Sequence, residues 1–338
     1  MANHFSFPNG FHLLIATHKR VFSWSQDGLV PVFRSATHGI LAARQSGDGR
    51  GILAIADSQI VILQNVRPGM SREYKLKGED GELRVLQFSS DSQILFFTST
   101  LSNAVQTYSI AHSRFLESAQ THPSPPTVVA TSSNSELLLV ASDSPPTISI
   151  QNLSTRNQPL EFLPLASLSR VVCASFHPSR STTFILGFAD GTLAAYRMPT
   201  PSGWLALRPP FEIGRYERLH KASMGGIVAA EFIYGYDARV ASVGRDGKCR
   251  LVDFGRGTVM LRTWHISSPA TSLSVLPVPK LSSPRRRPRR DADTEWKVLI
   301  AIGREDGKVL VFNTIGLLER EVKVGAGVFG LQWVEDSP

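Results

Sequence analysis

Ala174-Ser175-Phe176-His177-Pro178 decides the fold of this chain, because three other stretches repeat its pattern. The other copies are Leu86-Gln87-Phe88-Ser89, Ala230-Glu231-Phe232-Ile233 and Leu331-Gln332-Trp333-Val334. An aromatic residue that recurs at one place in a repeat indicates that a single supersecondary unit has been copied, since one such unit cannot bury its apolar face alone. The pattern therefore predicts a repeat architecture.

The spacing of the copies indicates the kind of unit. Phe88 and Phe176 lie 88 positions apart, and a degraded copy at Ala130-Thr131 halves this interval to about 43 residues, the length of a four-stranded propeller blade. Asp-Gly pairs flanked by apolar β-formers punctuate the copies at Asp190-Gly191, Asp246-Gly247 and Asp306-Gly307. Because Asp-Gly accepts the positive φ values of a two-residue turn, each pair predicts a hairpin. The hairpins join 183–188 to 192–196, 239–243 to 248–254, and 298–302 to 308–312.

The number of units predicts an all-β protein, a single seven-bladed β-propeller of four-stranded antiparallel blades over residues 1–338. Residues 11–34 supply three strands, and one further strand remains at 328–334 near the C-terminus. Pairing of that strand into the N-terminal blade would close the ring and hide the sheet edges that an open array of blades would expose. The expected blades are 11–34 plus 328–334, 39–77, 82–119, 126–164, 170–217, 226–265 and 269–324.

The repeats resemble those of the WD-repeat β-propeller family. The resemblance rests on Phe176-His177-Pro178-Ser179, an apolar strand, Gly187-x-x-Asp190-Gly191 and a strand that ends at the aromatic Tyr196. It covers most of the chain and is clearest around 170–197, 226–264 and 297–323. The Trp-Asp pair of the family is absent, with Val252-Asp253-Phe254 and Val311-Phe312-Asn313 in its place. Because most Gly-His pairs are missing too, we expect apolar packing to replace most of the family's buried Asp-His-Ser-Trp networks.

Composition agrees with an all-β globular protein, since 42% of the residues are hydrophobic and the chain contains 26 Gly and 21 Pro. No apolar run reaches the roughly 18 residues that cross a bilayer, and no signal-peptide pattern opens the chain. The two cysteines, Cys173 and Cys249, fall in expected strands, where Cys usually acts as a small buried hydrophobe. These features predict an intracellular protein, in the cytoplasm or nucleus, with no membrane partner.

The net charge of +8 is concentrated in one segment. Without five arginines, the chain would carry 31 basic and 28 acidic residues. These arginines lie in a predicted disordered insertion at 279–295, between the first two strands of the last blade. The segment is interpreted as a solvated insertion, a nuclear-import signal, or a contact for nucleic acid or an acidic partner. The five residues are Arg285, Arg286, Arg287, Arg289 and Arg290.

Two other segments are candidate partner-binding sites. The insertion 199–210 carries Trp204, which either packs on its own blade or contacts a partner. We expect the 199–210 and 279–295 insertions to lie on the face opposite the Asp-Gly turns. The segment 215–221 should form a basic, aromatic rim on the Asp-Gly face, a composition that suits protein interfaces. Its candidate residues are Arg215, Tyr216, Arg218, His220 and Lys221.

Patterns typical of enzymes are missing from the sequence. Its nine histidines show no His-x-x-x-His spacing and its cysteines no Cys-x-x-Cys spacing, so no metal site is predicted. The glycine-rich stretch 47–51 lacks the Lys-Ser/Thr of a phosphate-binding loop and is interpreted as a turn between two strands. We therefore predict no catalytic residues, no cofactor and no small-molecule substrate. An enzymatic propeller would need a polar site around the ring axis, where the inner strands offer mainly Val, Ala, Leu and Phe.

The function predicted from these patterns is a non-enzymatic scaffold that binds other proteins of a larger intracellular complex through its preformed faces. The alternative is a nucleic-acid-associated propeller of ribosome assembly or chromatin, which uses the basic residues 285–290 and binds with steep salt dependence. The layout of the chain, with a polar tail after the closing strand, leaves open a third interpretation. In it, the chain is the N-terminal propeller of a protein that recruits γ-tubulin complexes to spindle poles.

Overall fold

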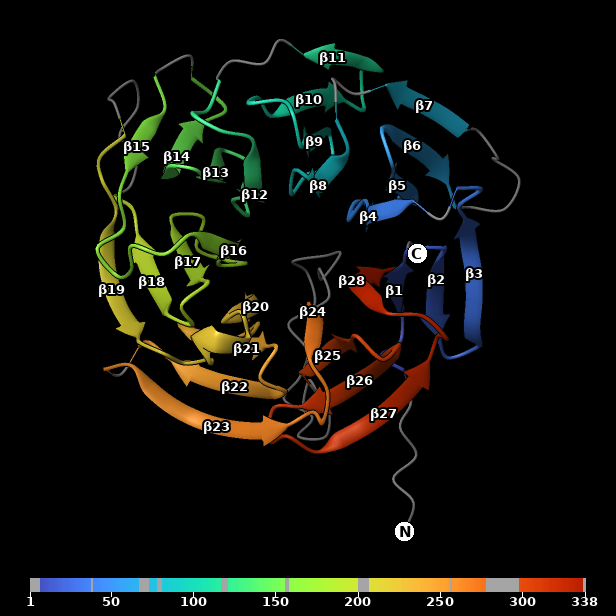
Figure 1. The fold of residues 1–338 in the computed structure, drawn as a ribbon. Coiled ribbons are helices and arrows are strands. Elements are labelled where there is room, and N and C mark those ends of the chain that lie inside the picture. The colour runs from blue at the N-terminus through green and yellow to red at the C-terminus, as the bar shows by residue number, and fades with distance from the viewer. Residues whose placement is uncertain are drawn as a thin grey trace, which may run out of the picture.

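The computed structural model describes residues 7–37, 39–66, 73–77, 81–116, 121–155, 158–199, 207–255, 257–277 and 298–336. These residues form seven four-stranded antiparallel sheets arranged as a ring (Figure 1). In each sheet one strand lies nearest the ring axis and the fourth lies at the rim. The chain is thus an all-β, seven-bladed propeller, as its repeats predict.

The blades follow one another along the chain, and we number them from the N-terminus. Blade 1 consists of β28 (Val328–Glu335), β1 (Phe11–Thr17), β2 (Arg20–Ser25) and β3 (Gly28–Arg34). Blade 2 consists of β4 (Ile40–Gln45), β5 (Ile52–Asp57), β6 (Ile60–Asn65) and β7 (Glu73–Lys77). Blade 3 consists of β8 (Leu83–Phe88), β9 (Ile94–Ser99), β10 (Gln106–Ser109) and β11 (Arg114–Leu116). Blade 4 consists of β12 (Pro126–Thr131), β13 (Leu137–Asp143), β14 (Pro146–Asn152) and β15 (Leu160–Phe162).

The remaining three blades have the same strand order. Blade 5 consists of β16 (Val171–Phe176), β17 (Thr183–Phe188), β18 (Leu193–Arg197) and β19 (Phe211–Tyr216). A short 3-10 helix, η1 (Ala222–Met224), lies in the connection to blade 6. Blade 6 consists of β20 (Ile227–Phe232), β21 (Arg239–Gly244), β22 (Lys248–Asp253) and β23 (Val259–His265). Blade 7 consists of β24 (Ala270–Val275), β25 (Leu299–Arg304), β26 (Lys308–Asn313) and β27 (Leu318–Lys323).

The C-terminal strand closes the ring, as predicted. β28 pairs antiparallel with β1 along its whole length, from Phe11 opposite Glu335 to Thr17 opposite Val328. It thereby supplies the innermost strand of blade 1, whose other strands come from the N-terminus. This pairing covers a sheet edge that an open array of blades would expose.

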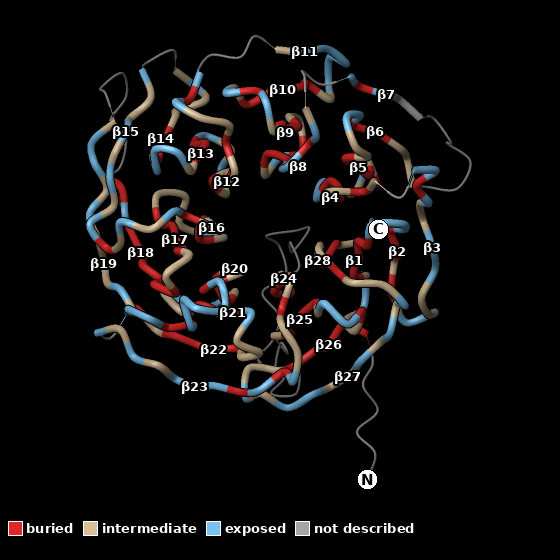
Figure 2. The backbone as a smooth tube through the Cα atoms, viewed as in Figure 1, coloured by how far each residue is buried: buried red, intermediate tan, exposed pale blue. Residues whose placement is uncertain are grey.

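The recurring aromatic residues fill the interfaces between blades. Phe176 and Phe232 end the innermost strands of their blades and are buried in hydrophobic clusters shared with the preceding blade. Trp333 has the same position in blade 1 and packs in a cluster with blade 7. Buried residues concentrate in the inner and middle strands, whereas the rim strands β3, β19, β23 and β27 are largely exposed or intermediate (Figure 2). The repeat therefore exists because each blade buries its face against the next one.

The Asp-Gly turns form the predicted hairpins but with a different turn geometry. Only the glycines, Gly191, Gly247 and Gly307, have positive φ, and the N–H of each donates to the carbonyl three residues earlier. This is the pattern of a type I turn followed by a left-handed residue, rather than of a two-residue turn. The aspartate precedes the left-handed position, and in blades 5 and 7 its carboxylate accepts the N–H two residues later.

Candidate partner-binding surface

Two loops on the Asp-Gly face border the same turn of blade 5. The first loop, 163–170, joins β15 to β16, and its Ser167 hydroxyl donates to the Asp190 carboxylate at 2.7 Å. The second, 217–226, joins β19 to β20, and its His220 N–H donates to the Gly191 carbonyl. Gly226 of the second loop also packs closely against the Ala189 carbonyl. The loops therefore lie on either side of the Asp190-Gly191 turn and form one continuous surface with it.

The first loop presents three leucines to solvent. Leu163, Leu165 and Leu168 are 70%, 89% and 94% exposed, the last two more than any other large hydrophobic residue in the described part of the chain. Sequence analysis missed them, because a sequence pattern alone does not tell whether apolar residues in a connection between blades are buried or exposed. Single exposed leucines are ordinary, but three in one six-residue stretch make this loop a candidate contact site.

The loop is held in place from both sides. The Arg215 guanidinium donates to the Leu165 carbonyl at 3.2 Å, and the Ser167 hydroxyl accepts the N–H of Ser169. Ala166, between the exposed leucines, is buried in the core of blades 4 and 5. The leucines thus project from a backbone whose conformation is already fixed, which reduces the conformational entropy lost on binding.

Most of the predicted basic, aromatic rim belongs to this surface. Arg215 is exposed and makes ion pairs with Glu212 and Glu217, while Tyr216 is half-buried against the core of blades 5 and 6. Arg218 and Lys221 are exposed and have no ion-pair partner among the described residues. Met224 of η1 adds a further exposed apolar side chain (45%). We call Leu163, Leu165, Leu168, Met224, Arg218 and Lys221 the leucine surface.

His220 does not belong to this surface, because its side chain is fully buried. Its Nδ1 lies 2.9 Å from an Asp246 carboxylate oxygen, and its Nε2 lies 3.0 Å from the Ser242 hydroxyl. Arg250 donates to the other Asp246 oxygen at 3.0 Å. Burial lowers the pKa of His220, more strongly than its contact with Asp246 raises it. Burial by itself would raise the pKa of Asp246, but the donors His220 and Arg250 outweigh it and hold that pKa below its usual range.

The inner strands carry polar side chains that hydrogen-bond across blade boundaries. The Gln332 amide makes bonds of 2.8 Å with the N–H and the carbonyl of Gln45 and so joins blades 1 and 2. The Glu231 carboxylate accepts the Val275 N–H at 2.8 Å and joins blades 6 and 7. Desolvation raises the pKa of Glu231 to about 7, against the opposing effects of that N–H and of Arg44. The expectation of an apolar set of inner strands is therefore incomplete, since Glu231, Arg44 and two glutamines occupy them.

The pKa of Glu231 predicts an unusual pH dependence of stability. A folded pKa near 7, above the ordinary 4.5, means that the folded protein holds this proton more tightly than the unfolded chain. The free energy of unfolding should therefore fall by about 3 kcal/mol as the pH rises from about 4.5 to above about 7. Glu231→Gln should remove this decrease, because an amide does not titrate in this pH range. Its oxygen can still accept the Val275 N–H, so the hydrogen bond between the blades is kept. Denaturant titrations at several pH values test this, with exposed Glu305→Gln as the control, and an unchanged slope in Glu231→Gln would contradict the assignment.

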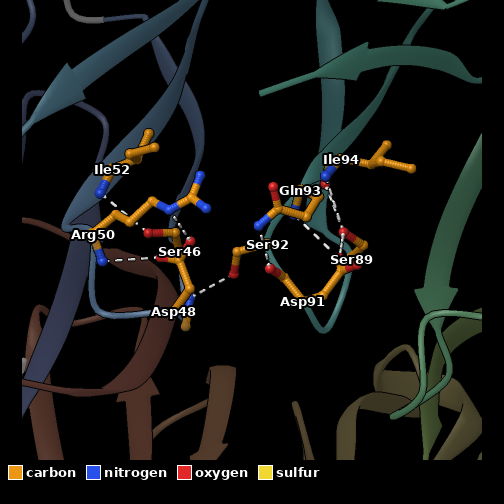
Figure 3. Close-up of polar contacts among 10 residues, drawn as sticks. Ser46, Asp48, Arg50, Ile52, Ser89, Asp91, Ser92, Gln93 and Ile94 are labelled. Atoms are coloured by element: carbon orange, nitrogen blue, oxygen red, sulfur yellow. Dashed lines mark hydrogen bonds and ion pairs between the residues drawn. The ribbon is translucent and has the colours of Figure 1, made fainter. Parts of the chain in front are cut away.

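The glycine-rich stretch 47–51 is the turn that its sequence predicts, between β4 and β5. Its Asp48 carboxylate accepts the Arg50 N–H at 3.0 Å and pairs with the Arg50 side chain (Figure 3). The Gly47 N–H donates to the Ser92 hydroxyl of the equivalent turn in blade 3 at 2.9 Å. One hydrogen bond thus joins the turns of blades 2 and 3, while Asp48 and Arg50 bind each other within their own turn.

The remaining predictions concern six candidate residues, the two cysteines, metal ligands and membrane spans. Trp204 and the five arginines, Arg285, Arg286, Arg287, Arg289 and Arg290, lie outside the described residues. Burial raises the pKa of Cys173 to about 12 and also raises that of Cys249, and both thiols are free. Among the described residues no group of three His, Cys, Asp or Glu side chains could hold a metal ion. No helix in the described ranges is long and apolar enough to span a membrane.

Comparison with other proteins does not assign the chain to a family. No protein-family model matches the chain, and no curated protein matches it either.

Proposed function

We propose that this protein is a non-enzymatic interaction scaffold of a larger intracellular complex, and that it holds a partner protein on the leucine surface. The observation that carries the proposal is the set of three leucines, 70–94% exposed, on a loop fixed by Arg215, Ser167 and Ala166. Apolar groups that project from a rigid frame are costly to keep in water and favour protein contacts. The closed ring supports the same role, because it holds the 163–170 and 217–226 loops at fixed positions relative to each other.

Membership of the WD-repeat family is part of this proposal. Its support is the buried network of blade 6, where His220, Ser242 and Asp246 occupy three of the four positions expected for that family's hydrogen-bond network. Arg250 completes the network. By resemblance, such propellers serve as assembly platforms, which agrees with the exposed leucines.

A capture experiment tests the scaffold role. Tagged protein purified from cells should retain its protein partners at high salt and after nuclease treatment, because apolar burial depends weakly on salt. Leu165→Ser/Leu168→Ser should lose those partners while its thermal unfolding stays unchanged, since both side chains are already exposed. The matched control is Ile315→Ser/Leu317→Ser, which alters two residues 60% and 50% exposed in the β26–β27 turn of blade 7.

The same experiment distinguishes the alternatives. Retention of every partner by Leu165→Ser/Leu168→Ser would overturn the assignment of the binding surface. Loss of all partners after nuclease, or after replacement of the five arginines at 285–290 by Ser, would favour the nucleic-acid interpretation.

A further inference from the structure

One position of the innermost strand joins neighbouring blades at three consecutive boundaries. It lies directly before the position of the recurring aromatic residue. In each case its side chain accepts a backbone N–H of the next blade's innermost strand, at 2.8–3.0 Å. These three blades therefore use the position for a hydrogen-bond acceptor. The acceptors are Glu231, Ser274 and Gln332, and the donors are the N–H groups of Val275, Trp333 and Gln45.

Arg44 has the same position in blade 2 and does not fit this pattern. The pairing of β4 with β5 and of β20 with β21 shows that Arg44 and Glu231 are equivalent. A guanidinium group cannot accept a hydrogen bond. The Arg44 Nη1 instead donates to the carbonyls of Ala43 and Leu331, both at 3.4 Å, and no acceptor of a described residue bonds its Nε or Nη2. A residue that breaks a structural pattern without an evident structural gain is a candidate for function.

Arg44 and Glu231 extend toward each other around the ring axis. Their strands, β4 and β20, lie on different sides of the axis, with β28 and β24 between them (Figure 1). Arg44 reaches the Leu331 carbonyl of blade 1, and Glu231 reaches the Val275 N–H of blade 7, the neighbouring blade. No ion pair among those of the described residues joins them. The Glu231 Oε1 accepts no hydrogen bond from a described residue, because its partner N–H binds Oε2.

Both side chains border a space inside the ring. Desolvation lowers the pKa of Arg44 and raises that of Glu231 to about 7, and each charge opposes the shift of the other. Nevertheless, both side chains keep part of their surface accessible to solvent, so the described residues do not fill the region between them. Charged groups removed from bulk water are costly when their hydrogen-bonding atoms stay unused. The free atoms of Arg44 and Glu231 therefore favour a ligand that binds both.

The two opposite charges restrict what that ligand can be. The Glu231 carboxylate would repel a simple anion, and the Arg44 guanidinium would repel a simple cation. A molecule that carries both charges is attracted by each group. The free Nε and Nη2 of Arg44 form the planar fork that binds a carboxylate through two hydrogen bonds. A carboxylate such as that of Glu231 binds an ammonium group.

We propose that Arg44 and Glu231 form a binding site at the ring axis for a small zwitterion, an amino acid or a related amino carboxylate. The ligand's carboxylate binds the Nε and Nη2 of Arg44, and its ammonium group binds the Oε1 of Glu231. The inference goes beyond the proposed scaffold function and does not depend on the leucine surface. It follows from the free donors of Arg44, the free oxygen of Glu231 and their positions on facing inner strands.

Isothermal titration calorimetry on the full-length protein tests the site. The probes are glycine, β-alanine and 4-aminobutyrate, in which one, two and three carbon atoms separate the two charged groups. Titration at about pH 8 keeps the Glu231 carboxyl, with its pKa of about 7, mostly ionised. At least one probe should bind saturably. Acetate, methylammonium and acetamide, which lack one or both charges, should bind about tenfold or more weakly.

Substitutions assign the binding to these two residues. Arg44→Gln and Glu231→Gln should each weaken binding of the best probe about tenfold or more, because each removes a charge-assisted hydrogen bond. Glu231→Gln can keep the hydrogen bond to the Val275 N–H and so preserves the blade boundary. The matched controls, Arg34→Gln and Glu305→Gln, alter exposed residues and should bind as the wild type does.

The wild-type titrations alone can overturn the inference, so it stays falsifiable if a variant does not fold. Absence of saturable binding by all three amino carboxylates would show that Arg44 and Glu231 are a structural pair only. Acetate that binds as tightly as the best probe would make the site an anion site, and equally tight acetamide would make it a site for an uncharged amide. Either result would overturn the zwitterion assignment. Binding that persists in both Arg44→Gln and Glu231→Gln would place the ligand elsewhere. None of these outcomes affects the scaffold role, which the capture experiment with the leucine variants tests separately.

Discussion

A chain that ends at residue 327 should fail to fold cooperatively, because β28 supplies the innermost strand of blade 1. Deletion of 328–338 removes the pairing partner of β1 and four side chains that are at most 4% exposed, Val328, Leu331, Trp333 and Val334. Each large apolar side chain stabilises a fold by about 1.5–3 kcal/mol when fully buried. Their combined loss is comparable with the total stability of a typical protein, about 5–15 kcal/mol. We expect aggregation, from the freed edge of β1, and no cooperative thermal transition.

Addition of the missing strand in trans provides the control. A synthetic peptide of residues 326–338, added during refolding, should restore solubility and a cooperative transition, because it can pair with β1 as β28 does. The same peptide with Trp333→Ala and Leu331→Ala should restore much less. A truncated protein that remains soluble and unfolds cooperatively without the peptide would show that the ring does not depend on this closure.

Replacement of Asp246 by alanine should produce the largest loss of stability among single substitutions in the turns. The Asp246 side chain is fully buried and binds both His220 and Arg250. Its removal leaves the Arg250 charge largely buried without its carboxylate, a change that costs about 3–5 kcal/mol in proteins. Chemical denaturation, followed by intrinsic fluorescence, would measure it as a lower free energy of unfolding.

The same turn in blade 7 offers a matched control. Asp306 has the position of Asp246 but its side chain is 40% exposed, and it pairs with Arg304. Asp306→Ala should therefore cost about 1 kcal/mol or less. Asp246→Asn, which keeps the shape and loses the charge, should fall between these two variants. If Asp246→Ala and Asp306→Ala lowered the free energy of unfolding by the same small amount, the blade 6 network would stabilise the fold no more than an ordinary turn does.

The residues that sequence analysis placed correctly are those whose structure depends on their neighbours in the chain. Asp-Gly pairs flanked by apolar β-formers predict the three hairpins at Asp190-Gly191, Asp246-Gly247 and Asp306-Gly307, and all three hairpins form. The predicted two-residue turn type was wrong. Only the glycine takes the left-handed conformation, and in blades 5 and 7 the aspartate carboxylate accepts the N–H two residues later. Composition does not distinguish these two kinds of turn.

The candidate site was only partly predictable, because exposure depends on segments far apart in the sequence. The sequence places His220 in a basic rim. In the structure its ring is buried and binds Ser242 and Asp246, which come from other parts of blade 6. The three leucines of the 163–170 loop are the opposite case, because they are apolar and exposed. Nothing in their sequence pattern singles them out, yet in the structure Ala166 is buried in the core and the leucines are exposed.

The sequence by itself determined the propeller, the seven blades and the closure by the C-terminal strand. Those features follow from apolar runs bounded by turn residues, from the repeat length and from the strand left over near the C-terminus, all of which are local or periodic properties. Only the tertiary structure decided which polar groups are buried and which apolar groups face water. That outcome depends on which blades meet, as at Glu231, where a carboxylate in an ordinary repeat position becomes desolvated at the boundary of blades 6 and 7.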